Sequence, residues 1–149
     1  PEGRLEEVIT RLSRVGFDSV IGYLEGGFET WKAAGKEFDT VESITAEEFA
    51  KNMETEQRSV IDVRKESEYL SEHVVNALNI PLDDLNLHLG ELKKDQSNFI
   101  HCAGGYRSVI ACSILKSRGV HNIVDVQGGF GAIKQTKVNV SAYVCPTTL

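Results

Sequence analysis

Short apolar runs alternate with helical segments between residues 41 and 126, and this alternation constrains the fold more than any other feature of the chain. Five runs read as strands, at 41–44, 59–63, 77–80, 98–101 and 122–126. Helical segments expected at 45–53, 65–71, 83–93 and 107–118 separate them. Strands that alternate with helices favour a parallel sheet with helices on both of its faces. The sequence therefore predicts the α/β class of fold.

Local signals mark the ends of several of these elements. Thr45 is followed three residues later by Glu48, a capping box that opens a helix. Pro81 ends the strand at 77–80, because the residue before a proline and the proline itself cannot continue regular pairing. Four leucines at helical spacing predict one helix over residues 83–93: Leu82, Leu85, Leu89 and Leu92.

The overall composition is that of an ordinary soluble domain. The chain has 149 residues, of which 41% are hydrophobic and 26% are charged, with a formal net charge of -6. An acidic chain of this kind is a poor general binder of nucleic acid or of anionic membranes. No apolar run approaches the roughly 18 residues of a membrane-spanning helix. We therefore expect neither nucleic acid nor a membrane as a partner.

Three widely spaced cysteines, Cys102, Cys112 and Cys145, form no recognisable disulfide framework. None of their spacings matches a metal-binding motif, so no metal site is expected. This pattern favours a reducing, cytoplasmic setting. Cys112 lies within a predicted helix and is expected in the core. Cys145 is expected to be an exposed bystander, with the alternative that it resolves a modified Cys102.

The sequence contains an internal repeat. Residues 16–32 read GFDSVIGYLEGGFETWK and residues 119–134 read GVHNIVDVQGGFGAIK, with a Gly-Gly-Phe turn in each. Such repeats indicate a duplicated unit, and the first copy lacks the elements that precede the second. We therefore interpret residues 1–38 as the C-terminal remnant of a preceding repeat or a linker, 39–136 as the main domain and 137–149 as a C-terminal tail. The alternative is a helical N-terminal extension that belongs to one domain.

The junction between the strand at 98–101 and the helix at 107–118 carries the chemistry. Cys102 lies at the carboxyl end of that strand, where open parallel sheets bind their ligands. Gly104 and Gly105 allow successive backbone amides to turn inward as an anion-binding nest. The start of the following helix adds its free amides and the positive end of its dipole. The Cys102 thiol is therefore expected to be a thiolate.

Neighbouring side chains complete this predicted anion site. Arg107 presents a planar fork that matches an oxyanion with paired hydrogen bonds. Ser108 can cap the helix or donate into the loop, and Tyr106 either lines the mouth of the pocket or covers the loop. His101 points to the opposite face of its strand from its neighbours, so we expect a packed histidine.

Residues 41–135 resemble the rhodanese family. The resemblance rests on VIDVR at 60–64, NIP at 79–81, the Cys-x-x-Gly-x-Arg loop at 102–107 and Gly-Gly-Phe at 128–130. It implies a three-layer rhodanese-like fold, with a five-stranded parallel sheet between helices on both faces. It also implies that Cys102 is the nucleophile, which carries a persulfide, and that Asp62 supports the loop. The implied substrate-binding residues are Ala103, Gly104, Gly105, Tyr106, Arg107 and Ser108.

The function that the resemblance implies is sulfur transfer from thiosulfate or a persulfide to a thiol or cyanide, without a cofactor. The chain departs from the family at residues 71–77, SEHVVNA, where the usual glycines and proline are missing, so a different local turn is expected. The repeat resembles the C-terminal part of bacterial fusions of a metallo-β-lactamase-fold hydrolase with rhodanese-like domains. That resemblance implies an upstream hydrolase-type domain as a partner and makes residues 1–38 part of a preceding rhodanese-like repeat.

Several functions stay open on sequence alone. They are an active sulfurtransferase, a non-catalytic or sulfur-relay module of a larger persulfide-handling hydrolase, and a cysteine phosphatase or arsenate reductase. Cys102 could also be an inert cysteine at the end of a strand. The loop has four residues between Cys102 and Arg107, one fewer than the loops of cysteine phosphatases. Because the shorter loop suits one sulfur atom better than a phosphate group, sulfur transfer is the leading hypothesis.

Overall fold

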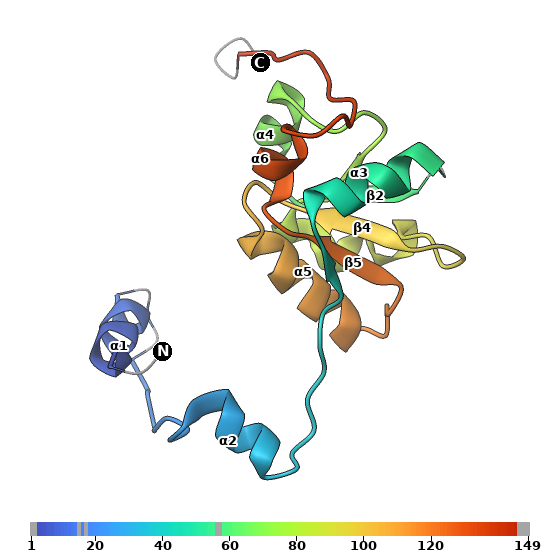
Figure 1. Ribbon diagram of the computed structural model, residues 1–149. Coiled ribbons are helices and arrows are strands. Elements are labelled where there is room, and N and C mark those ends of the chain that lie inside the picture. Colours follow the sequence, from blue (N-terminus) through green and yellow to red (C-terminus); the bar gives the residue numbers. More distant parts are fainter. Residues whose placement is uncertain (1–2, 15, 17, 56–57, 146–149) are drawn as a thin grey trace. The chain divides into compact units, whose positions relative to one another are not determined.

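The computed structural model describes residues 3–14, 16, 18–55 and 58–145, and the chain divides into two compact units (Figure 1). Residues 1–39 form the first unit and residues 40–149 form the second. Every strand that the structure describes belongs to the second unit.

The second unit is built on a five-stranded sheet. Its strands are β1 Ser43–Ile44, β2 Ser59–Asp62, β3 Leu78–Asn79, β4 Asn98–His101 and β5 Ile123–Val126. Their order across the sheet is β1-β5-β4-β2-β3, and every neighbouring pair is parallel. The predicted five-stranded parallel sheet is confirmed, and β4 is its middle strand.

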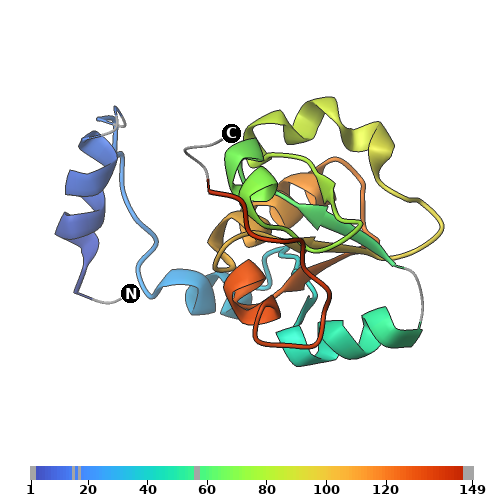
Figure 2. The same cartoon turned by 90° about the horizontal axis from the view of Figure 1, so that it is seen from above.

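Helices cover both faces of this sheet, as predicted. They are α3 Ala46–Thr55, α4 Glu66–Ser71, α5 Tyr106–Ser117 and α6 Gly129–Ile133, with the 3₁₀ helices η1 Leu82–Leu87 and η2 Leu89–Glu91. Alternate strand residues point to opposite faces. Ile61 and Ile100 pack in the cluster that includes α5 and η1, whereas Val60 and Phe99 pack in the cluster that includes α3 and α6. Figure 2 shows α3 and the 3₁₀ helices on opposite sides of the strands.

The single helix predicted over residues 83–93 is wrong, because the structure has two 3₁₀ helices there. The Asp84 N–H donates to the Pro81 carbonyl at 2.9 Å, a bond that spans three residues. Leu85 and Leu92 are buried, and a three-residue spacing places leucines on one face of a 3₁₀ helix as well. Aspartate, asparagine and glycine make this stretch a weak α-helix former.

The segment that departs from the family pattern forms a tight turn at Asn76. Asn76 has a φ of 67°, in the left-handed region that glycine usually occupies. The Ala77 N–H closes the turn by donating to the Val74 carbonyl at 3.0 Å. Val74 also forms an antiparallel bridge with Val140, which ties the C-terminal segment to the domain. Asparagine tolerates a left-handed backbone better than most residues, so the turn forms without the missing glycines.

The first unit contains two helices, α1 Leu5–Ser13 and α2 Gly27–Ala33. Neither helix buries a residue among those the structure describes. Ile21 is fully exposed and Trp31 is 41% exposed, although both are large apolar residues. The interpretation of residues 1–38 as the remnant of a further repeat stays a prediction.

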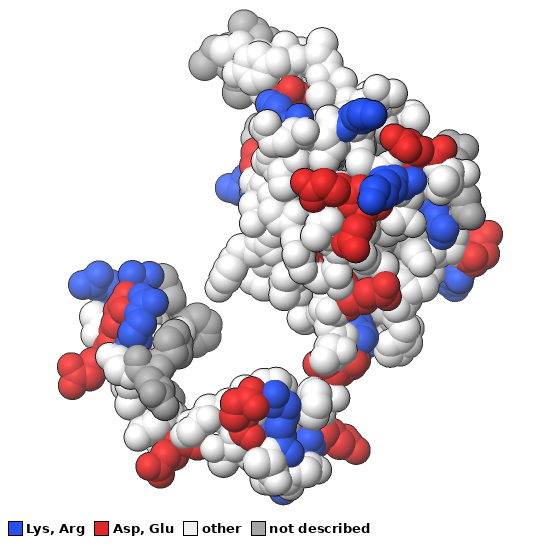
Figure 3. Space-filling view, in the orientation of Figure 1, with Lys and Arg blue, Asp and Glu red and all other residues white. Residues whose placement is uncertain are grey.

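Acidic and basic side chains are interspersed on the face of the molecule drawn in Figure 3. That face therefore offers no continuous basic surface to a polyanion. In the described parts of the chain, no helix combines the length and the apolar character that crossing a membrane requires.

Candidate active site around Cys102

Cys102 lies directly after β4, at the carboxyl end of the middle strand. The chain passes through Ala103 and Gly104 before α5 begins at Tyr106. Gly105 precedes the helix with a φ of 99°, a conformation that favours glycine. The predicted sequence of strand, loop and helix is therefore present, with the cysteine next to the first turn of α5.

Polar groups contact the sulfur of Cys102. The Gly105 N–H donates to Sγ at 3.2 Å, and the Cys102 thiol donates to Ser108 Oγ at 3.6 Å. Burial raises the pKa of this thiol, but hydrogen bonds from Ser108, Gly104 and Gly105 stabilise the thiolate more strongly, so the pKa lies below its ordinary value. Three of the predicted loop residues thus contact the sulfur.

The other predicted loop residues lie around the groups that contact the sulfur. Tyr106 is 81% exposed, so most of its ring faces solvent. Ala103 contributes its carbonyl, which accepts a hydrogen bond from the Gly131 N–H at 3.0 Å. Arg107 lies in the first turn of α5, where its side chain is engaged by a carboxylate of α4.

The Gly-Gly-Phe turn braces the loop from the start of α6. The Phe130 N–H donates to the Cys102 carbonyl at 2.6 Å, next to the bond between Gly131 and Ala103. A Cβ atom on Gly129 would lie 2.4 Å from the Cys102 carbonyl oxygen, closer than real side chains approach. Only glycine fits at position 129. Sequence reasoning identified the motif, but this contact between two distant loops carries no signal in the sequence of either loop.

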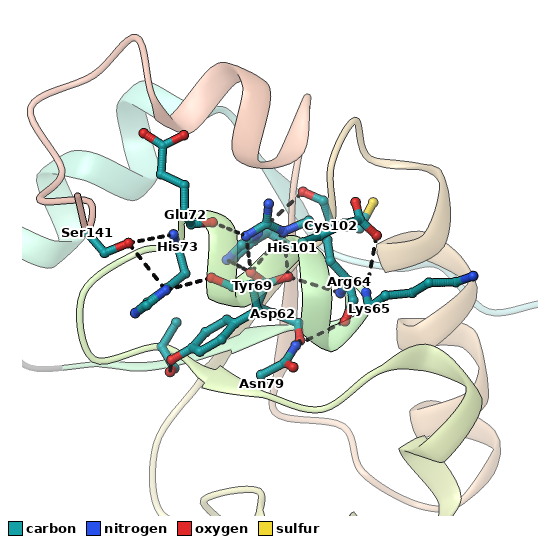
Figure 4. Close-up of polar contacts among 12 residues, drawn as sticks. Asp62, Arg64, Lys65, Tyr69, Glu72, His73, Asn79, His101, Cys102 and Ser141 are labelled. Carbon is teal, nitrogen blue, oxygen red and sulfur yellow. Dashed lines mark hydrogen bonds and ion pairs between the residues drawn. The ribbon is translucent and has the colours of Figure 1, made fainter. Parts of the chain in front are cut away.

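A buried charged network lies behind the loop (Figure 4). The Asp62 carboxylate accepts hydrogen bonds from Arg64 Nε at 2.9 Å and Arg64 Nη2 at 2.6 Å, and both side chains are buried. Arg64 also donates to the Glu72 carbonyl at 2.8 Å and lies 4.1 Å from the centre of the Phe130 ring. Asp62 is therefore connected to the Cys102 loop through Arg64 and Phe130. Sequence reasoning missed Arg64, although it ends the VIDVR motif.

His101 is completely buried beside this network. Its Nδ1 lies 3.3 Å from the Cys102 carbonyl oxygen, and its Nε2 lies 3.8 Å from Asp62 Oδ2. Burial is the main effect on His101 and lowers its pKa, although the charge of Asp62 acts in the opposite direction. The histidine before the cysteine is thus packed in the core, as the alternation along the strand predicted.

The Arg107 guanidinium forms a paired contact with Glu68 of α4. Nη1 lies 2.7 Å from Oε2 and Nη2 lies 2.9 Å from Oε1, and both side chains are about one-third exposed. The hydrogen bond from Arg107 is the largest effect on Glu68 and lowers the pKa of its carboxyl. The fork predicted to hold a substrate anion therefore already holds a carboxylate. Sequence reasoning missed Glu68, which lies 39 residues from its partner.

The other two cysteines differ from Cys102. Cys112 belongs to α5 and is buried. Burial, together with the charge of Asp125, raises the pKa of its thiol to about 12. It is therefore a core residue, as predicted. Cys145 is exposed, whereas Cys102 and Cys112 are buried. Within the described ranges, no group of three or more histidine, cysteine, aspartate or glutamate residues could hold a metal ion.

The fold and the site define an α/β domain with a cysteine of lowered pKa at the carboxyl end of the middle strand of a parallel sheet. Comparison with known proteins narrows this class. The family model of the rhodanese-like domain matches residues 45–136, and the chain belongs to that family.

Three individual proteins illustrate the similarity of the chain to known proteins. The chain is 33% identical over 101 residues to the uncharacterized protein YqhL of Bacillus subtilis (strain 168), which covers 65% of this chain and 79% of that protein. It is 28% identical over 90 residues to a sulfurtransferase of Allochromatium vinosum, covering 60% of this chain and 84% of that one. A solved structure of a rhodanese-related protein from Thermoplasma volcanium has a TM-score of 0.60 and 32% identity, covering 67% and 97% of the two chains.

Proposed function

We propose that this chain is a sulfurtransferase, which moves a sulfane sulfur from thiosulfate or a persulfide donor to a thiol or cyanide acceptor. The observation that carries the proposal is the donor shell that a Cys102 thiolate has: the Gly105 N–H, 3.2 Å from Sγ, and the hydroxyl of Ser108, whose Oγ accepts from the neutral thiol at 3.6 Å. Such a shell stabilises negative charge on sulfur, in a thiolate or in a persulfide. The similarity to a sulfurtransferase of A. vinosum supports the same class of reaction.

The proposed reaction is covalent catalysis in two steps. The Cys102 thiolate attacks the outer sulfur of the donor, the bond within the donor breaks, and sulfite or a thiolate leaves with the electron pair. The outer sulfur of the new Cys102 persulfide then faces the amides of Gly104 and Gly105. An acceptor attacks that sulfur, its bond to Sγ breaks, and the Cys102 thiolate returns. Neither step needs a metal or a cofactor.

The remaining predicted residues have supporting roles in this proposal. Asp62 keeps Arg64 in place behind the loop, and Ala103 and Tyr106 border the entrance to the sulfur. Arg107 can hold the anionic end of a donor only when its guanidinium leaves Glu68.

Formation of thiocyanate from cyanide tests the proposal. With excess donor, the natural chain should turn over repeatedly, whereas Cys102→Ser should fall to the background rate because no other thiol has the donor shell. Cys145→Ser is the matched control and should retain the activity. Turnover that survives in Cys102→Ser would overturn the proposal, and equal loss in Cys145→Ser would show that Cys145 resolves the persulfide.

A sulfur-relay module of a larger persulfide-handling hydrolase is the alternative. It is favoured by apolar side chains that are exposed beside the loop: Tyr106 is 81%, Val109 42% and Ile110 38% exposed. A chain that takes up sulfur but does not turn over with small acceptors would match this alternative. The loop from Cys102 to Arg107 is one residue shorter than the loops of cysteine phosphatases. This length disfavours a cysteine phosphatase or arsenate reductase.

We also propose that residues 1–38 are the closing part of a second rhodanese-like repeat. The Gly26–Gly27 turn has φ angles of 71° and 60°, and the Gly128–Gly129 turn has angles of 73° and 55°. The two copies of the repeat therefore share a backbone conformation as well as a sequence.

A second shared feature of the copies is a lysine above the phenylalanine of the turn. Lys32 lies 5.2 Å from the centre of the Phe28 ring, and Lys134 lies 5.6 Å from that of Phe130. Phe28 is 55% exposed, whereas Phe130 is 6% exposed.

The upstream hydrolase-type domain implied by the resemblance is part of this proposal. A cytoplasmic setting is also proposed, on the ground that the spacing of the three cysteines matches no disulfide framework.

A further inference from the structure

The ion pair between Arg107 and Glu68 lies at the entrance to the candidate site. Arg107 belongs to the first turn of α5, directly after the Cys102 loop, and Glu68 belongs to α4. Both nitrogen atoms of the fork donate to the carboxylate, at 2.7 and 2.9 Å. These are the donors that an oxyanion would use in a bidentate contact. An anionic donor must therefore displace Glu68 or approach a guanidinium whose charge is already balanced.

A cavity of about 260 Å³ adjoins this ion pair and is lined by Arg64, Ser67, Glu68, Ser71, Glu72 and Phe130. The cavity is linked to the loop through Phe130, whose N–H donates to the Cys102 carbonyl, and through Glu68, which holds Arg107. Its lining includes two carboxylates, those of Glu68 and Glu72.

The cations around this cavity are also paired. Arg64 is bound to Asp62 and Lys134 is bound to Glu72. Lys65 extends away from the other labelled residues in Figure 4. Arg64, Arg107 and Lys134 are thus each balanced by a carboxylate.

Sulfur donors differ in the charge that they bring to such a site. Thiosulfate is a dianion, whereas an uncharged thiol forms a persulfide with at most a single negative charge. We propose that Glu68 is a specificity-determining residue, which holds Arg107 and thereby selects organic persulfides of low charge over thiosulfate. This inference rests on the proposed function, because it names the donor class of the same Cys102 site.

The transfer from such a donor, R–S–SH, is balanced. The Cys102 thiolate forms a bond to the outer sulfur, the S–S bond of the donor breaks, and R–S⁻ leaves with the electron pair and takes a proton from water. The donor is reduced to a thiol, and Cys102 is oxidised to a persulfide. Such a donor brings no second negative charge to the ion pair of Arg107 and Glu68.

The test compares kcat/KM for two donors, thiosulfate and hydroxyethyl persulfide, with cyanide as the acceptor and the whole chain as the enzyme. Glu68→Gln removes the charge but keeps an oxygen that can accept the hydrogen bond from the Lys65 N–H. The ratio of thiosulfate to persulfide efficiency should rise about tenfold, mainly through a lower KM for thiosulfate. Glu66→Gln, on the same helix, is the matched control and should leave the ratio within about twofold.

A double variant identifies the cause of the change. In Glu68→Gln combined with Arg107→Gln, the gain for thiosulfate should disappear, because no guanidinium is released. A ratio that stays unchanged in Glu68→Gln, or a gain that persists in the double variant, overturns the inference while sulfur transfer itself stands. Glu68→Ala provides the same comparison if the glutamine variant does not fold. Failure of the natural chain to accept sulfur from either donor would instead overturn the proposed function and this inference with it.

Discussion

Cys102 and Cys112 are two buried thiols with opposite chemistry. Burial disfavours a thiolate at both positions. At Cys112 burial prevails and raises the pKa to about 12. At Cys102 burial is outweighed by hydrogen bonds from Ser108 and from the amides of the loop, so the pKa is lowered. The donors at the start of α5, rather than depth in the core, therefore distinguish the candidate nucleophile.

Ser108→Ala should raise the pKa of Cys102, because the variant loses a side-chain hydrogen bond to the sulfur. Alkylation of Cys102 by iodoacetamide, followed by mass measurement of its peptide, should be roughly three- to tenfold slower at pH 7. The rise of the rate with pH should move to higher pH. Ser113→Ala, which lies further along α5 and bonds only the Val109 carbonyl, should behave like the natural chain. Equal rates in both variants would contradict the role given to Ser108.

His101 should make the domain sensitive to acid. Burial lowers its pKa below the ordinary value of 6.5, so the unfolded chain binds a proton that the folded chain excludes. The stability that depends on a neutral His101 is therefore fully present above pH 6.5 and is lost as the pH falls below it. When the pH falls from 7.5 to 5.5, the natural chain should lose about 1 kcal/mol more of its free energy of unfolding than His101→Gln does. His121→Gln, at an exposed position, is the control, and identical pH slopes for His101→Gln and the natural chain would refute the argument.

At the residue scale, sequence reasoning identified the side chains that are neighbours along the chain. Cys102, Gly105 and Ser108 lie close together in the sequence, the outer two six residues apart, so their spacing already encodes their contact. Arg64 and Glu68 come from a different part of the sequence. Their contacts arise only when α4 packs beside the loop, and no local pattern predicts that packing.

The Gly-Gly-Phe turn is the element that fixes the loop, and a second glycine of the same unit provides a matched control. Gly129 and Gly119 both have left-handed backbones, with φ angles of 55° and 82°. A Cβ at Gly129 would meet the Cys102 carbonyl oxygen at 2.4 Å, whereas a Cβ at Gly119 would meet nothing within 4 Å. Both variants place alanine at a positive φ within one unit, so a larger loss in Gly129→Ala reports the steric contact.

Gly129→Ala should therefore lower the free energy of unfolding by about 2 kcal/mol more than Gly119→Ala, and it should disturb sulfur uptake. Urea unfolding followed by circular dichroism provides the measurement. Similar stability of the two variants, with sulfur uptake intact in both, would show that the turn does not hold the loop.

At the scale of elements, the inner strands were easier to predict than the edge strands. β2, β4 and β5 have partners on both sides, and each contains a pair of adjacent apolar residues, Val60-Ile61, Phe99-Ile100 and Ile123-Val124. β1 and β3 are edge strands of two residues each, shorter than the predicted runs at 41–44 and 77–80. An edge strand has a single partner, so its length depends on tertiary contacts that its own sequence does not encode.

At the scale of the whole molecule, the division into residues 1–39 and 40–149 predicts independent behaviour. A chain that contains only residues 40–149 should unfold at the same urea concentration as the second unit of the full chain. It should also take up sulfur at the same rate, within about twofold, because every residue of the candidate site lies in that unit. A lower midpoint or slower uptake would show that the first unit contributes to the site.

The central claim is that Cys102 carries the transferred sulfur, and intact-mass measurement tests it most directly. The natural chain is incubated with thiosulfate or with hydroxyethyl persulfide, and its mass is measured before and after addition of cyanide. We predict a gain of one sulfur atom on the peptide that contains Cys102, removed by cyanide and absent in Cys102→Ser. No gain with either donor, or an equal gain in Cys102→Ser, would contradict the claim.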